Sequence, residues 1–233
     1  MKTPVSSTLA AAFVAAAFLL SANSSFADAR IKKTHTRTRS GTYQGSNGHS
    51  GTFSKSTTRE KGRTERSATA TNQDGKTATH EATRTWDKET GTGTVSSSTT
   101  GFNGKTSSRE GTVTKTGEGT IQSQGTVTGP NGKTSTYDLT TTKTDDGRST
   151  AGTVTGPNGR QTVVTSITER SAGEKERTTT LTGPNGKTLE REIATTRNGD
   201  GTGTRTVEVT KPDGTTETRT QTFTLDPKPT PAP

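Results

Sequence analysis

The strongest constraint on this chain is a turn signal that returns at an almost fixed spacing. Asn-Gly or Asp-Gly pairs place their glycines at successive steps of 27, 29, 28, 27, 27 and 28 residues, namely at Gly48, Gly75, Gly104, Gly132, Gly159, Gly186 and Gly214. The sequence around the middle members also repeats, as residues 125–134 and 152–160 illustrate. A fixed period with recurrent sequence is typical of repeat architectures. The chain therefore predicts a tandem array of about seven units of 27–29 residues.

Each unit is predicted to be a strand–turn–strand. A second, looser turn falls about halfway between the tight ones, for example at residues 60–62, 117–119 and 145–147. Between turns, threonine occupies alternate positions, as at Thr216, Thr218, Thr220, Thr222 and Thr224. A period of two is the strand period, and threonine favours strands. The pattern predicts antiparallel strands of about ten residues joined by alternating turn types.

The tight turns carry their own geometry. In Gly129-Pro130-Asn131-Gly132, proline fixes φ near −65° and suits the first central position of a type I turn. Glycine then takes the left-handed conformation, which gives a hairpin loop with a glycine bulge. A type I′ turn centred on Asn131-Gly132 is the alternative, and both geometries produce a hairpin.

These elements predict an all-β fold of tandem antiparallel β-hairpins, forming an elongated meander sheet or a solenoid. Only 21% of the residues are hydrophobic, so a conventional compact core is not expected. Scattered valine, leucine and isoleucine residues such as Leu139, Val154 and Leu181 provide at most a thin apolar seam. A largely disordered chain is the alternative that this composition leaves open.

The two ends differ from the repeat region. Residues 1–29 combine Lys2, an uncharged Ala-rich run and small residues before Arg30, which predicts a cleaved secretory signal peptide. Residues 30–40 form a basic N-terminal arm, residues 41–225 the β-hairpin repeat region, and residues 226–233 a Pro-rich tail. Export to the periplasm, the cell surface or the medium follows from the leader.

The sequence offers no recognisable catalytic machinery. The three histidines, His35, His49 and His80, lack metal-ligand spacing and are interpreted as solvated surface residues. No nucleophile, phosphate-loop or dinucleotide motif occurs, so neither catalytic nor cofactor-binding nor metal-ligating residues are assigned, and the protein is predicted not to be an enzyme. Strands such as residues 215–224 lack an apolar face, so no integral membrane insertion is expected after signal cleavage.

Positive charge supplies the only candidate binding residues. The chain has a net charge of +9, and most residues that follow a tight-turn glycine are cationic. These are Lys76, Lys105, Lys133, Arg160 and Lys187. If the repeats stack, they form a row that matches a polyanion, although lysine beside a hairpin also protects a sheet edge from aggregation. Arg30, Lys32 and Lys33 of the basic arm are the second candidate anion-binding group.

The recurrent Thr-Gly-Pro-Asn-Gly-Lys/Arg segment behind a signal peptide resembles a group of uncharacterised small exported bacterial repeat proteins rich in threonine and glycine. The strand–turn–strand units are also similar in architecture to those of curlin-type secreted amyloid subunits, from which the chain differs in period, in basicity and in lacking Gln/Asn ladder positions. That similarity implies self-association through strand edges. The Thr-x-Thr arrays resemble those of ice-binding proteins.

The sequence therefore predicts an exported, non-enzymatic β-repeat protein with a structural, adhesive or surface-binding role in the cell envelope or extracellular matrix. The alternative is a soluble binder of polyanions, such as acidic polysaccharide, lipopolysaccharide or nucleic acid. Binding of ice through the Thr-x-Thr arrays is a third interpretation. The expected partners are a polyanionic surface or polysaccharide, and further copies of the same chain.

Overall fold

Fourteen antiparallel strands make up the fold in a computed structural model that describes residues 34–46 and 48–225. In chain order they are β1 (His35–Gly45), β2 (Ser50–Glu60), β3 (Arg63–Asn72), β4 (Thr77–Thr85), β5 (Thr92–Thr100), β6 (Thr106–Gly117), β7 (Thr120–Thr128), β8 (Thr134–Lys143), β9 (Gly147–Thr155), β10 (Gln161–Ser171), β11 (Glu174–Thr182), β12 (Thr188–Arg197), β13 (Thr202–Thr210) and β14 (Thr216–Leu225). Within those residues, no helix is long and apolar enough to cross a membrane.

The hairpin prediction is confirmed, including the geometry of its tight turns. Gly132 N–H donates to Gly129 O over 2.9 Å, and Gly132 has a φ of +77°. Asn131 Oδ1 accepts a hydrogen bond from the N–H of Lys133 at 3.2 Å. This is the type I turn followed by a left-handed glycine, the first of the two predicted geometries. The tight turns all lie at one end of the strands, here called the tight-turn rim, and the looser turns define the loose-turn rim.

The prediction of an open meander or solenoid is wrong, because the sheet closes into a barrel. β1 pairs with β14 through Gly41↔Leu225 to Gly45↔Gln221, so the first and last strands become neighbours. Closure gives hydrogen-bond partners to strands that would otherwise form two long exposed edges. Beyond the last registered pair with β14, residues 35–40 of β1 continue along β2 alone.

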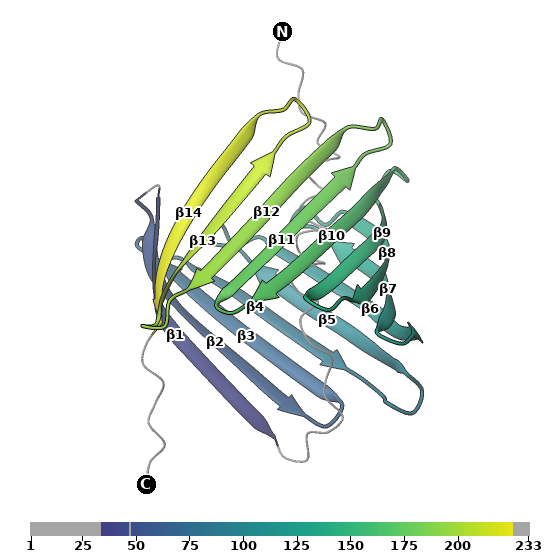
Figure 1. Cartoon of the computed structure of the whole chain (residues 1–233), viewed down its shortest axis with the longest axis horizontal. Coiled ribbons are helices and arrows are strands. Elements are labelled where there is room, and N and C mark those ends of the chain that lie inside the picture. The colour runs from purple at the N-terminus through teal and green to yellow at the C-terminus, as the bar shows by residue number, and fades with distance from the viewer. Residues whose placement is uncertain (1–33, 47, 226–233) are drawn as a thin grey trace.

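Figure 1 shows how the closed sheet is folded in space. Strands β10–β14 form one wall, strands β1–β5 form the opposite wall, and β6–β9 connect them. The strands of the two walls run across one another in this view because strands in a closed sheet tilt steeply relative to the barrel axis. Each wall therefore presents one face to the interior and one to the outside.

Side chains alternate strictly between these two faces. On β10, Thr162, Val164, Ser166 and Thr168 are buried, whereas Val163 and Ile167 between them are 49% and 53% exposed. Residues directly opposite each other in adjacent strands share a face, so the assignment extends around the barrel through the register of each pair. For example, Val164 lies opposite Leu181, and Leu181 lies opposite Leu189. The inner face is called the lumenal face below.

The thin apolar seam expected from the sequence is a core that lines one side of the lumen. Its cluster combines β7 to β11 and comprises Val127, Tyr137, Leu139, Val154, Val164 and Leu181. Leu139, Val164 and Leu181 are completely buried. Inner-face residues of β14 such as Arg219 remain exposed, so the lumen is packed on one side and open to water on the other.

Glycine and aromatic residues are paired on the lumenal face. A Cβ atom added to Gly111 would lie 2.2 Å from Tyr137 Oη, and one added to Gly203 would lie 2.3 Å from the Phe223 ring. The Phe223 ring of β14 thus covers a glycine of the adjacent strand β13, and the Tyr137 ring of β8 extends over β7 to a glycine of β6. Such pairs of glycine and aromatic residues permit strong local curvature of a sheet. These pairs supply apolar volume to a chain in which aromatic residues make up only 4%.

The segment boundaries expected from the sequence are partly visible. β1 begins at His35, so the end of the predicted basic arm, residues 30–40, belongs to the barrel wall. The predicted signal peptide and the Pro-rich tail from residue 226 lie outside the described residues.

A candidate anion-binding lumen

Basic residues of the strands are concentrated on the lumenal face. The register places every described strand lysine and arginine there except Arg63. The lumenal group consists of Arg37, Arg39, Lys55, Arg59, Arg66, Arg84, Arg109, Lys115, Lys143, Arg148, Arg170, Lys175, Arg177, Arg191, Arg197, Arg205 and Arg219. Within a strand, these basic residues lie an even number of positions away from the buried valines and leucines, so they share the same face.

Acidic residues of the strands show the opposite distribution. They lie on the outer face among the threonines, as Glu176 does between Lys175 and Arg177. Among the described strand carboxylates, Glu217 alone is lumenal, and it forms an ion pair with Lys211 at the tight-turn rim. Arg63, the outward base, pairs with Glu60 and Glu65. The wall of the barrel is therefore acidic outside and basic inside.

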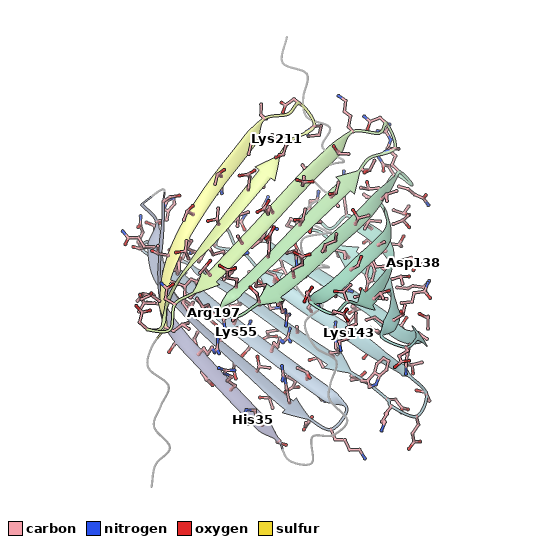
Figure 2. All side chains as sticks on the ribbon, viewed as in Figure 1. His35, Lys55, Asp138, Lys143, Arg197 and Lys211 are labelled. Atoms are coloured by element: carbon pink, nitrogen blue, oxygen red, sulfur yellow. The ribbon has the colours of Figure 1, made fainter. Side chains whose placement is uncertain are left out.

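The lumenal bases act on one another across the interior. Arg148 of β9 lies close enough to Arg84 of β4 and Arg66 of β3 for their charges to lower its pKa, although these strands are far apart around the sheet. Lys55 of β2 is affected in the same way by Arg197 of β12. Figure 2 shows Lys55 and Arg197 close together between the two walls, whereas Asp138 lies at the outer margin. The bases thus share one enclosed space.

Two arginines are built into the packed side of the lumen. Arg109 is 1% exposed, donates from Nε to Tyr137 Oη over 3.0 Å and from Nη2 to Ser123 Oγ over 3.1 Å, and places its guanidinium 4.5 Å from the Tyr137 ring centroid. Arg177 donates from Nε to Thr168 Oγ1 over 3.1 Å. Neutral hydroxyls and a ring hold these cations in place, so the contacts position their charge without cancelling it.

The positive charge of the lumen is energetically unfavourable, as the pKa values of its bases indicate. Burial, followed by the charges of neighbouring arginines, lowers the pKa of Arg84 to about 10 and that of Arg148 to about 10. Arginine side chains ordinarily remain protonated well above that range. Both groups are still cationic near neutral pH, and an anion in the lumen would relieve the repulsion between them.

A pH profile of stability should report this repulsion through Lys175. Burial, with a further contribution from guanidinium groups of which Arg177 is the first, lowers the pKa of Lys175 from 10.5 to about 8. Between these values the unfolded chain binds more protons than the barrel, so the free energy of unfolding should increase with pH from about 8 to 10.5. One proton limits the slope to about 1.4 kcal/mol per pH unit, and water in the lumen reduces it. Urea unfolding at several pH values measures the slope.

Lys175→Met should stabilise the barrel at pH 7 and flatten the increase above pH 8. The adjacent variant Glu176→Gln serves as its control, since Glu176 lies on the outer face of the same strand, away from the lumenal bases. An unchanged slope in Lys175→Met would show that the lysine is not the group responsible.

The binding residues expected from the sequence lie elsewhere. Lys76, Lys105, Lys133, Arg160 and Lys187 are all exposed in tight turns, so the predicted row of charge becomes a ring around the tight-turn rim. The structure does not bring this ring together with the lumenal bases. Arg30, Lys32 and Lys33 lie outside the described residues.

The interpretation of the histidines changes at one position. His80 is lumenal and half-buried, and its Nδ1 lies 2.8 Å from Thr99 Oγ1. Burial, then Lys55 and Arg66, lowers its pKa, so His80 adds little charge at neutral pH. No group of three or more potential metal ligands is found within the described part of the chain.

Comparisons with family models, with curated proteins and with solved structures find no match to this chain.

Proposed function

We propose that this protein is an exported, non-enzymatic binding protein that holds an anionic ligand inside its barrel. The proposed location is the periplasm or the cell surface, on the strength of the leader-like residues 1–29. The observation that carries the proposal is the separation of charge across the wall, with bases inside and carboxylates outside. It favours the polyanion-binding alternative over a purely structural or adhesive role.

The physical reasoning starts from the cost of the lumenal charge. A group of like charges in a partly buried space raises the free energy of the folded state, and a structural role does not require that cost. An anion that enters the lumen converts repulsion into attraction in an environment less polar than water, where charge–charge interactions are stronger than at the outer surface. The acidic outer face disfavours binding of the same anion on the outside of the wall.

Self-association through strand edges, and with it an amyloid-like structural role, remains a prediction. Closure of the sheet leaves little support for it, because the edges beyond the β1–β14 pairing are confined to residues 216–219 of β14 and to residues 35–40 of β1. Arg37 and Arg39 lie in the β1 segment, and charge on an edge strand disfavours pairing with another chain.

The proposal is tested by isothermal titration of the purified chain with inorganic tripolyphosphate at low and moderate salt. A lumen variant replaces the four strand lysines with methionine, at Lys55, Lys115, Lys143 and Lys175. A rim variant makes the same change of charge at Lys76, Lys105, Lys133 and Lys187. We expect the lumen variant to lose at least tenfold in affinity, and we expect the rim variant to bind almost as the unaltered chain does.

The opposite pattern, with binding lost in the rim variant and retained in the lumen variant, would assign the anion to the tight turns and overturn the proposal. Binding of the unaltered chain should weaken as salt increases, since mobile ions screen the attraction. Absence of any tripolyphosphate binding at low salt would also contradict the proposal.

A further inference from the structure

One cavity gathers lumenal bases more closely than the rest of the barrel. It has a volume of about 480 Å³ and opens at the loose-turn rim, where Gly117, Gly119, Thr120 and Gly147 form part of its lining. Its charged and aromatic lining residues are Arg84, Trp86, Lys115, Lys143, Arg148 and Arg170. The volume lies in the range of pockets that bind small organic molecules. We call this cavity the loose-turn pocket.

The pocket has a strongly positive lining. Its five cations come from five strands, β4, β6, β8, β9 and β10, so the closed sheet is what brings them together. Lys143 and Arg148 are direct partners in the register of β8 and β9. Carboxylates adjacent in sequence to lining residues, such as Glu118 and Asp146 in the turns at the rim, are exposed and do not line the cavity. An anion in this pocket would meet bases on several sides.

Arg148 provides an independent indication of an anion site. Its Nη2 atom is buried and has no hydrogen-bond partner among the described residues. A buried guanidinium N–H without an acceptor is costly, and native proteins seldom leave such a donor unpaired. An oxyanion in the pocket would accept from this donor, since the planar guanidinium matches phosphate and sulfate oxygens.

The lining is not only charged. Trp86, the only tryptophan in the chain, is half-buried and lines the cavity together with Ile121. An indole and an aliphatic side chain offer an uncharged surface against which a ring can pack, and aromatic faces contribute affinity through stacking. The ligand therefore has to satisfy a polyvalent anion site and an apolar contact at the same time.

We propose that the loose-turn pocket binds a small phosphate or sulfate ester that carries more than one negative charge on a ring-shaped body. This inference rests on the proposed lumenal anion binding and adds to it a location and a class of ligand. A nucleotide and a phosphorylated sugar share this chemistry. The charge contacts Arg148 and its neighbours, and the ring lies against Trp86 and Ile121.

The test compares probes that match in charge and differ in the ring. The purified chain is titrated calorimetrically with inorganic tripolyphosphate, with ATP, which adds a nucleoside to the same triphosphate, and with glucose 1,6-bisphosphate. Because Trp86 is the only tryptophan, its fluorescence reports directly on occupancy of the pocket. We expect at least one ring-bearing probe to bind tenfold more tightly than tripolyphosphate and to change the Trp86 emission.

Tighter binding of ATP alone indicates that the natural ligand is a nucleotide. Tighter binding of glucose 1,6-bisphosphate alone indicates that it is a phosphorylated sugar. No ring advantage for either probe overturns the ligand class.

Variants locate the site. Lys143→Met combined with Arg148→Met should weaken every probe by at least tenfold, and Lys133→Met at the opposite rim should have no effect. Trp86→Leu should remove the ring advantage while it preserves binding of tripolyphosphate. If the Lys143/Arg148 double variant binds tripolyphosphate normally, the pocket assignment fails while the proposed lumenal function stands. If the unaltered chain binds none of the probes, both fail.

Discussion

Millimolar tripolyphosphate should raise the Tm of this protein by about 5–10 °C, whereas sodium chloride at the same ionic strength should leave it nearly unchanged. A ligand that binds the folded state at a hundred times its Kd stabilises that state by about 2.7 kcal/mol. For a domain of this size, each kcal/mol corresponds to about 2–4 °C. The effect should be present at millimolar concentration and then grow only with the logarithm of the tripolyphosphate concentration. Millimolar concentration is well below the range in which salts act on all proteins through the solvent. Differential scanning calorimetry measures both shifts.

The lumen variant described above distinguishes specific binding from nonspecific attraction to a cationic chain. Without added anion, it should melt at a higher temperature than the unaltered protein, because it removes repulsion between lumenal bases. With tripolyphosphate, it should gain much less. An equal gain in both proteins would mean that the stabilisation does not come from the lumen.

The second large effect is expected for Gly111→Val, which should cost about 3 kcal/mol or more of the free energy of unfolding. The first atom of the new side chain would lie 2.2 Å from Tyr137 Oη and 2.3 Å from the backbone oxygen of Gln124. The Tyr137 ring would have to leave its position over the glycine, and the hydrogen bond from Arg109 Nε would break. A guanidinium that is 1% exposed would then lose one of its acceptors. Urea unfolding followed by far-UV circular dichroism measures the cost.

Thr112→Val is the matched control for this substitution. Thr112 is the next residue in β6 and lies on the outer face, whereas Gly111 is lumenal. The same side chain is therefore introduced where it has room. Its effect should stay within about 0.5 kcal/mol, as is usual for surface positions. Comparable losses of unfolding free energy in both variants would show that valine destabilises this strand for reasons unrelated to the Tyr137–Arg109 contact.

The local elements of the fold could be predicted from the sequence, because turn chemistry and threonine periodicity are short-range signals. The tight turn at Gly129–Gly132 and the strand that includes Thr216–Thr224 were both predictable in this way. Closure could not be derived, since an open meander and a closed barrel share the same hairpins. What distinguishes them is the pairing of Gly41 with Leu225 across most of the chain, and that pairing depends on twist, tilt and curvature accumulated over all strands.

In the sequence, the candidate site was indicated only by the alternation of basic and acidic residues along the strands. In residues 174–181, Lys175 and Arg177 share the parity of Leu181, whereas Glu174 and Glu176 share that of Thr178 and Thr180. Without a closed sheet, this parity merely separates two faces of a ribbon, so the exposed lysines of the turns looked more relevant. Closure turns the face that carries these bases into the interior of the barrel, and it places bases from distant strands in one space.

The near-constant repeat length also links copy number to the size of the enclosed space. Each unit leaves the tight-turn rim and returns to it, so one unit adds two strands to the circumference without disturbing the register of its neighbours. At about 4.8 Å per strand, the gain or loss of one unit changes the girth of the barrel by about 10 Å. Duplication or deletion of a single segment of 27–29 residues would therefore change the diameter of the interior in one genetic step. The alternation of inner and outer side chains would be preserved.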